Sequence, residues 1–107
     1  MSLKFPYSGR KFKLTMDNSL SIINNYSNDG KTIEIEFLNG DLKGTTMEVP
    51  FTWRQLPDNN FLISWQESTK ATVVHCDNFE NKKSYAYYTT MDGDFFVMEG
   101  TITSIQV

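Results

Sequence analysis

Few polar side chains in this 107-residue sequence could do chemistry, and His75 is the only histidine among them. It lies in an apolar stretch, where an imidazole could shuttle a proton, bind a metal ion or donate a hydrogen bond to a ligand. A histidine that is simply hydrogen-bonded to a neighbouring tyrosine or carboxylate is the commoner case. Cys76 follows it directly, but adjacent strand residues point to opposite faces, and no further His or Cys is present. We therefore expect neither a metal site nor a Cys–His nucleophile.

Three carboxylates in strand-like segments could act as acid or base, although most carboxylates near turns are simply solvated. They are Glu67, Asp77 and Glu99. If the odd-numbered residues of segment 95–101 face the interior, Glu99 is buried and needs a partner. The candidates for that partner are Arg54, Tyr87 and His75. If the even-numbered residues face inward instead, Glu99 is a surface residue.

Aromatic side chains make up 14% of the chain and could stack on a flat ligand or offer hydroxyl groups to it. Filling of a protein core explains aromatic residues in strands equally well. The aromatic candidates are Trp53, Trp65, Tyr85, Tyr87 and Tyr88. None of the six glycines falls into a phosphate-binding pattern.

The elements that must position these side chains are strands. Nearly every segment alternates apolar and polar residues with a period of two, and no stretch of ten or more residues keeps helical spacing. The clearest strand is 31–38, and the Asn39-Gly40 pair after it is a strong hairpin turn. The expected strands are 11–16, 20–26, 31–38, 44–53, 61–66, 71–79, 84–90 and 95–105.

The links between these strands are short enough for hairpins, which predicts an antiparallel up-and-down meander. Such a sheet closes on itself or leaves open edges, and an eight-stranded barrel is just wide enough to be filled by side chains or to hold one small ligand. We therefore expect an all-β protein: one domain, 1–107, forming a small antiparallel β-barrel of about eight strands. Pro50 interrupts the fourth strand and predicts an edge, a bulge or a bend there.

Several short motifs carry a family resemblance. They are Phe61-Leu-Ile-Ser-Trp65-Gln-Glu67, Thr72-Val-Val-His75-Cys-Asp77-Asn-Phe79, Tyr87-Tyr88-Thr89 and Gly100-Thr101, with Gly9-Arg10-Lys11-Phe12 and Thr52-Trp53. In these the chain resembles the small calycin-like proteins related to molybdenum-cofactor biosynthesis protein F, the MoaF-like proteins. The resemblance implies a lipocalin-like barrel with a small-molecule site inside.

The residues that share a face with His75 depend on the loop between the fifth and sixth expected strands, because a shift of one residue moves every side chain to the other face. A four-residue loop would place His75 on the face of residues 62, 64 and 66. A three- or five-residue loop, or a bulge at Glu67, would place it near Ile63 and Trp65. The resemblance, rather than the turn, favours the second arrangement, which gathers Trp65, Glu67, His75 and Asp77.

Composition excludes other classes of partner. The net charge is −3 and no basic cluster exceeds 10–13, which argues against nucleic acid. No apolar run approaches the roughly 20 residues that span a bilayer. The lack of an apolar leader stretch and the single cysteine favour the cytoplasm. We expect no cofactor.

We expect a binding barrel that takes a small apolar or aromatic ligand in its interior. The expected ligand-binding residues are Trp65, Glu67, His75, Tyr87 and Glu99, with Arg54 and Trp53. The first alternative is an enzyme that resembles the calycin-like decarboxylases of phenolic acids, in which Tyr87, Arg54 and Glu67 or Glu99 would serve. The second is a packed barrel whose outer face, with Phe51, Tyr88 or Phe96, forms a homodimer.

Overall fold

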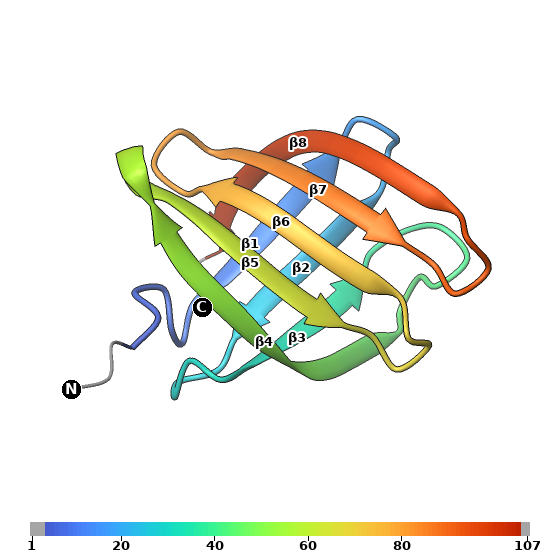
Figure 1. Ribbon diagram of the computed structural model, residues 1–107, viewed down its shortest axis with the longest axis horizontal. Helices are drawn as coiled ribbons and strands as arrows, with labels where there is room; N and C mark the ends of the chain where they lie inside the picture. Colours follow the sequence, from blue (N-terminus) through green and yellow to red (C-terminus); the bar gives the residue numbers. More distant parts are fainter. Residues whose placement is uncertain (1–3, 106–107) are drawn as a thin grey trace.

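The computed structural model describes residues 4–105 as a closed barrel of eight antiparallel strands. Each strand pairs with its neighbours in the chain, and the last pairs with the first (Figure 1). The strands are β1 Lys11–Met16, β2 Ser21–Tyr26, β3 Thr32–Phe37, β4 Thr46–Leu56, β5 Asn60–Gln66, β6 Thr72–Asn78, β7 Lys83–Thr89 and β8 Phe95–Ile105. A 3-10 turn, Pro57–Asn59, joins β4 to β5. The expectation of an all-β up-and-down barrel is confirmed.

The two longest strands, β4 and β8, each belong to both sides of the barrel. Residues 46–50 of β4 pair with β3, and residues 51–56 pair with β5. Residues 95–101 of β8 pair with β7, and residues 100–105 pair with β1. One side is thus built from β4 to β8, and β1 to β3 cross behind it (Figure 1).

The strand expected to be interrupted at Pro50 instead continues to Leu56. Pro50 is the last residue that pairs with β3, and Phe51 is the first that pairs with β5. The missing amide hydrogen of proline therefore falls where the strand changes partner, so it breaks the ladder least. Because the barrel closes, β4 has no free edge.

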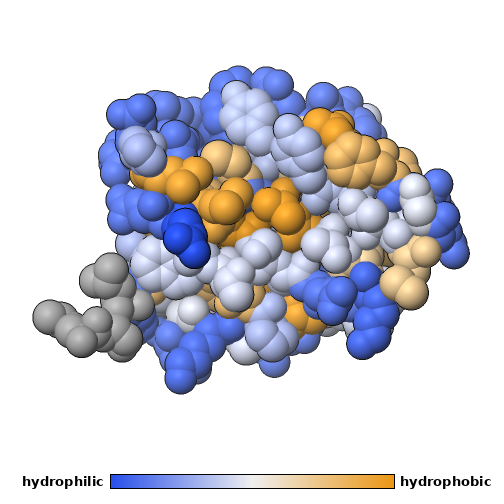
Figure 2. Space-filling model, viewed as in Figure 1, coloured by the Kyte–Doolittle hydropathy of each residue, from blue (hydrophilic) through white to orange (hydrophobic). Residues whose placement is uncertain are grey.

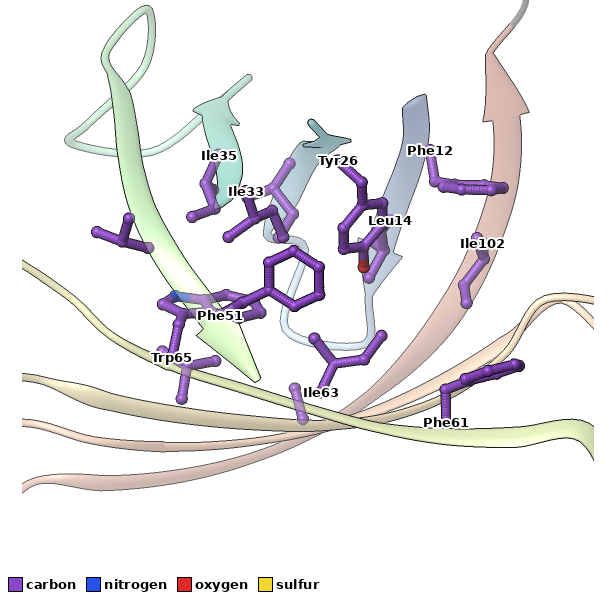
Figure 3. Close-up of a cluster of buried hydrophobic side chains, with 14 of the residues drawn as sticks. Phe12, Leu14, Tyr26, Ile33, Ile35, Phe51, Phe61, Ile63, Trp65 and Ile102 are labelled. Atoms are coloured by element: carbon purple, nitrogen blue, oxygen red, sulfur yellow. The ribbon is translucent and has the colours of Figure 1, made fainter. Parts of the chain in front are cut away.

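Aromatic side chains fill one end of the barrel, which we call the closed end. Phe5, from the segment before β1, is 2% exposed, and its ring centroid lies 4.7 Å from that of Tyr26 and 5.4 Å from that of Trp53. Tyr7 packs on Phe79 with 4.1 Å between centroids. Inward-pointing aliphatic and aromatic side chains fill the middle of the barrel (Figure 3). A cavity of about 520 Å³ lies on the outside of this end, beside Phe5 and Trp53. We call the opposite end of the barrel the open end.

Candidate functional site

The loop between β5 and β6 decides which side chains reach the barrel interior. The amide of Glu67 donates to the carbonyl of Ala71 over 2.8 Å, and the amide of Lys70 donates to the carbonyl of Glu67 over 2.8 Å. The loop is thus three residues long, and Ile63 pairs with His75. The preferred register is confirmed: Trp65, Glu67, His75 and Asp77 are all buried on the inner face.

Glu67 places a carboxylate inside the open end, with only 7% of the residue exposed. Trp65 Nε1 donates to Oε2 over 3.4 Å, and the Tyr88 hydroxyl donates to Oε1 over 3.2 Å. Burial, and then the negative charge of Glu67, raise the pKa of Tyr88 above its ordinary value. The phenol therefore stays protonated and remains a donor. The described residues give Glu67 two neutral donors and no cationic partner.

His75 lies below Glu67, against the indole of Trp65, with ring centroids 5.0 Å apart. Its Nδ1 is 3.3 Å from Asp77 Oδ1 and 3.3 Å from Ser84 Oγ, while the Ser84 hydroxyl donates to Asp77 Oδ1 over 2.5 Å. A serine, a histidine and an aspartate are therefore in contact. They do not form a nucleophilic triad, because in a triad serine and aspartate use different ring nitrogens. Here both contacts are made to Nδ1, on one side of the ring, and His75 also lines the inner cavity.

Further polar groups are buried in the barrel interior. Asn24 is fully buried, and within residues 4–105 neither of its side-chain polar atoms has a hydrogen-bond partner; the same holds for Asp77 Oδ2. Burial, and then the charge of Asp77, raise the pKa of Tyr26 well above its ordinary value. A neutral phenol therefore sits beside the carboxylate in this low-dielectric interior.

Two adjacent cavities lie at the open end. The inner one has a volume of about 40 Å³ and reaches Trp65, Glu67 and His75. The outer one, of about 540 Å³, forms the mouth, where Leu42 and Phe96 contribute apolar surface. Both cavities are lined by Leu20, Phe37, Tyr88 and Met98. The volume of the mouth is typical of a small-molecule site, whereas the inner cavity is barely larger than the roughly 30 Å³ that one water molecule occupies.

The structure separates the residues expected to bind a ligand. Trp65, Glu67 and His75 come together at the open end. The other four do not join them there. Tyr87 is 48% exposed on the outside of the barrel, and Arg54 and Glu99 are also exposed there. Trp53 packs into the closed end.

Which residues of β7 and β8 face inward explains the outward positions of Tyr87 and Glu99. Ser84, Ala86 and Tyr88 face inward, so Tyr87 faces out, and a run of three tyrosines in five residues gives no polarity contrast from which to read this. In β8 the even-numbered residues face inward, which makes Glu99 a surface residue, the second of the two alternatives considered. The only sequence signal for the correct parity of β7 is the small size of Ser84 and Ala86, which leaves room inside a narrow barrel.

Of the three residues considered for an outer face, two lie inside the barrel and Phe96 is exposed at its mouth. Phe51 is buried in the core, Tyr88 points into the open end, and Phe96 lines the mouth. Tyr88, considered both as a ligand contact and for the outer face, thus lies on the inner side. Leu20, Phe37 and Met98, which line both cavities, were missed. They are ordinary apolar residues, and nothing in their type marks them as ligand contacts.

Comparison with known proteins agrees with this architecture. The MoaF-like family matches residues 8–103. The chain belongs to the MoaF-like family. The expected resemblance is thereby confirmed. No match was found among curated proteins.

A solved structure resembles this MoaF-like barrel over nearly its whole length. It is a crystal structure described as that of a putative beta-lactamase from Burkholderia vietnamiensis. The two chains are 31% identical, with a TM-score of 0.92, over 97% of this chain and 100% of the other. Within residues 4–105, no three His, Cys, Asp or Glu side chains are grouped to hold a metal ion, and no helix is long and apolar enough to cross a membrane.

Proposed function

We propose that this MoaF-like barrel binds a small aromatic molecule at its open end, with the ring in the mouth and a short polar head group in the inner cavity. One observation carries the proposal: a buried carboxylate, Glu67, lines a small inner cavity of about 40 Å³, which shares lining residues with a largely apolar mouth of about 540 Å³. Apolar clefts with a few convergent polar groups are the usual form of ligand sites. The core fills the middle of the barrel, so the proposed site is at the end rather than in the interior.

The side chains around the mouth favour a flat apolar body. Phe37, Phe96 and Met98 line it, and the rings of Tyr88 and Phe96 lie 6.1 Å apart, centroid to centroid. Faces and edges of aromatic rings are good partners for another ring, and a methionine adapts to its shape. A planar ring would therefore find contacts on several sides of the mouth.

The base of the cavity favours a cationic head group with N–H donors. Each oxygen of Glu67 accepts one hydrogen bond from a neutral donor, which leaves acceptor capacity and an unneutralised negative charge. A buried charge is costly unless it is paired, so a protonated amine would gain a partner that the described side chains do not supply. With about 40 Å³ below the mouth, the head group has room for only one or two heavy atoms.

Benzylamine and benzyl alcohol test this proposal, since they differ in charge but hardly in shape, and benzoate adds the opposite charge. Binding is measured by calorimetry and by the fluorescence of Trp65 in a Trp53→Phe background, because Trp53 lies at the closed end. We expect benzylamine to bind at least about tenfold more tightly than the alcohol, as for a charge-assisted hydrogen bond, and benzoate to bind most weakly.

Two variants locate the site. Glu67→Gln keeps the shape of the side chain and should remove the preference for the amine. Met98→Trp should fill the mouth and abolish binding of both neutral and charged probes. Saturable binding that neither variant changes would overturn the placement. Failure of every probe to bind would overturn the proposal.

An enzymatic role receives less support from the geometry. Tyr87, Arg54 and Glu99, the residues of the decarboxylase-like alternative, are all on the outer surface. Hydrolysis of a β-lactam, suggested by the description of the similar structure, would need an accessible nucleophile. Ser84 is fully buried and its hydroxyl donates to Asp77. Turnover of a chromogenic β-lactam by the wild type, abolished by Ser84→Ala, would contradict this view.

A further inference from the structure

The outer surface of β5 to β8 is unusually apolar for an exposed sheet. Phe95 is 60% exposed, Val97 57% and Tyr87 48%. Leu62 of β5 lies on the other side of this surface, and the half-buried Val74 and Cys76 of β6 lie in between. Four neighbouring strands, β5 to β8, therefore contribute. Figure 2 shows this side of the molecule as a band of apolar surface with paler side chains beside it and hydrophilic residues around it. We call this surface the outer patch.

The outer patch is large enough to matter. Tyr85, 43% exposed, also belongs to it. An aromatic side chain carries about 150 to 250 Å² of surface, so Tyr85, Tyr87 and Phe95, each exposed by roughly half, contribute on the order of 300 Å². Leu62, Val74, Cys76 and Val97 add to this area. The sum approaches the largest apolar patch of a typical monomer, roughly 300 to 600 Å². With a polar rim it would supply much of the roughly 800 Å² per partner of a standard interface.

One row of residues crosses the outer patch at right angles to the strands. From β4 to β8, each of the following residues is paired with the next: Arg54, Leu62, Cys76, Tyr85 and Glu99. Neighbouring strands are about 4.8 Å apart, so Arg54 and Glu99 each lie two strands, or about 10 Å, from Cys76. The row thus has a cation at one end, an anion at the other and a small thiol in the middle.

We infer that the outer patch binds a second copy of this chain, face to face, about a two-fold axis that runs parallel to β6 past Cys76. Such an axis exchanges the two ends of the row. Arg54 of each copy then lies opposite Glu99 of the other, and the apolar residues between them meet at the centre. The inference is independent of the ligand site, because the outer patch is on the other face of the sheet.

The charges favour a second copy over other occupants. An isologous dimer requires a surface that is complementary to itself, and opposite charges placed symmetrically about the centre meet that condition. A membrane surface or a nucleic acid would instead call for basic residues around the patch. The described rim has Arg54 at one end of the row and Glu99 at the other, with Lys83 of β7 beside Glu99, and the whole chain has a net charge of −3.

Charge reversal and mixing test this geometry by sedimentation velocity. Arg54→Glu and Glu99→Arg should each raise the dimer dissociation constant about tenfold, because each variant places like charges opposite one another. An equimolar mixture of the two variants should restore association, since both rim pairs of the mixed dimer are again opposite in sign. Val97→Glu should leave a monomer with the thermal stability of the wild type. Lys13→Glu, on the exposed face of β1, is the control and should not alter association.

Cys76 offers a second readout that does not depend on affinity. Two sheets that pack face to face are about 10 Å apart, too far for a disulfide but within the span of a short bis-maleimide. Burial, and then the charge of Asp77, raise the pKa of the Cys76 thiol, so the reaction should be run at mildly alkaline pH. We expect a covalent dimer in the wild type and none in Val97→Glu.

The inference is overturned if the wild type is monomeric at every concentration, or if Val97→Glu leaves its association unchanged. Association that persists in Val97→Glu would place the interface elsewhere on the barrel. Failure of the mixed variants to associate, with each single variant weakened, would exclude the two-fold axis parallel to β6.

Discussion

The hydroxyl of Tyr88 donates a 3.2 Å hydrogen bond to Oε1 of Glu67, and so joins the end of β7 to the loop that follows β5. Between these two elements lies β6, which carries His75. The bond therefore spans β6 on the inner face of the barrel wall. It holds the carboxylate where a ligand could reach it.

Replacing Tyr88 with Phe should remove one of the two hydrogen bonds to Glu67. Because the acceptor is a buried carboxylate, we expect the free energy of unfolding to fall by about 1.5 to 3 kcal/mol, measured by urea denaturation. Tyr85→Phe is the matched control on the outer surface and should change it by less than about 0.5 kcal/mol. Equal effects of the two substitutions would contradict this role of the Tyr88 hydroxyl.

Gly100 allows the barrel to close between β8 and β1. A Cβ atom at this position would lie 2.1 Å from the carbonyl oxygen of Thr15 and 2.9 Å from the Cα atom of Met16. Since these are backbone atoms of a paired strand, they cannot move aside without breaking the ladder. We expect Gly100→Ala to cost about 3 kcal/mol or more in thermal or urea unfolding.

Gly40→Ala is the control that distinguishes the steric clash at Gly100 from the general cost of replacing a glycine. Gly40 has a φ of +77°, but a Cβ atom there would meet nothing within 4 Å. Only the strain of the left-handed conformation remains, about 1 to 2 kcal/mol. If Gly40→Ala proved as destabilising as Gly100→Ala, close approach of β1 and β8 would not be the cause.

The Ser84 hydroxyl donates a hydrogen bond to Asp77 inside the barrel, and both residues are at most 1% exposed. Ser84→Ala should leave Asp77 with His75 as its remaining partner, and the free energy of unfolding should fall by about 1 to 3 kcal/mol. Ser64→Ala removes an outward-facing hydroxyl that is paired with Thr52 and should have a much smaller effect. A small effect at both positions would show that the Ser84 bond to Asp77 contributes little.

His75→Ala distinguishes a structural histidine from a ligand contact. The ring is 2% exposed and packs on Trp65, so its loss should cost about 2 to 4 kcal/mol. Calorimetry on the folded variant should also show weaker binding of benzylamine if Nε2 lines the proposed site. Unchanged binding with lowered stability would make His75 a core residue only.

Tyr26 should make the fold sensitive to alkali. Its pKa is raised well above the ordinary value of 10.0, first by burial and then by the charge of Asp77, so the folded state keeps the proton after the unfolded chain has lost it. At a pH below the ordinary pKa, Tyr26 is protonated in both states, and its contribution to the free energy of unfolding does not change with pH. As the pH rises from there toward the folded-state pKa, the free energy of unfolding falls. Urea unfolding between about pH 9 and 11 should show a shallower decline for Tyr26→Phe than for Tyr85→Phe.

Local pattern determined most of the fold. Alternation with a period of two marked all eight strands. The Asn39-Gly40 pair lies in the link between β3 and β4, but the expected tight turn is wrong, because the chain reverses there over a longer loop in which Phe37 is bonded to Thr45 and Gly44. Hairpin-length links left antiparallel neighbours as the only pairing. The boundaries differ by a few residues, most at β4, where the alternation continues through Pro50 because the strand changes partner there.

The face on which each side chain lies was decided by tertiary structure. Glu67 and Glu99 are the same residue type in similar alternating segments, yet one is buried and the other exposed. A strand has no intrinsic inside, and parity follows from the loop length and from which side chains fit the narrow interior. The sequence by itself determined an eight-stranded antiparallel meander, and the family resemblance added the grouping of Trp65, Glu67 and His75 on one face. Only packing decided that Tyr88, not Tyr87, reaches Glu67, and that Arg54 and Glu99 face outward.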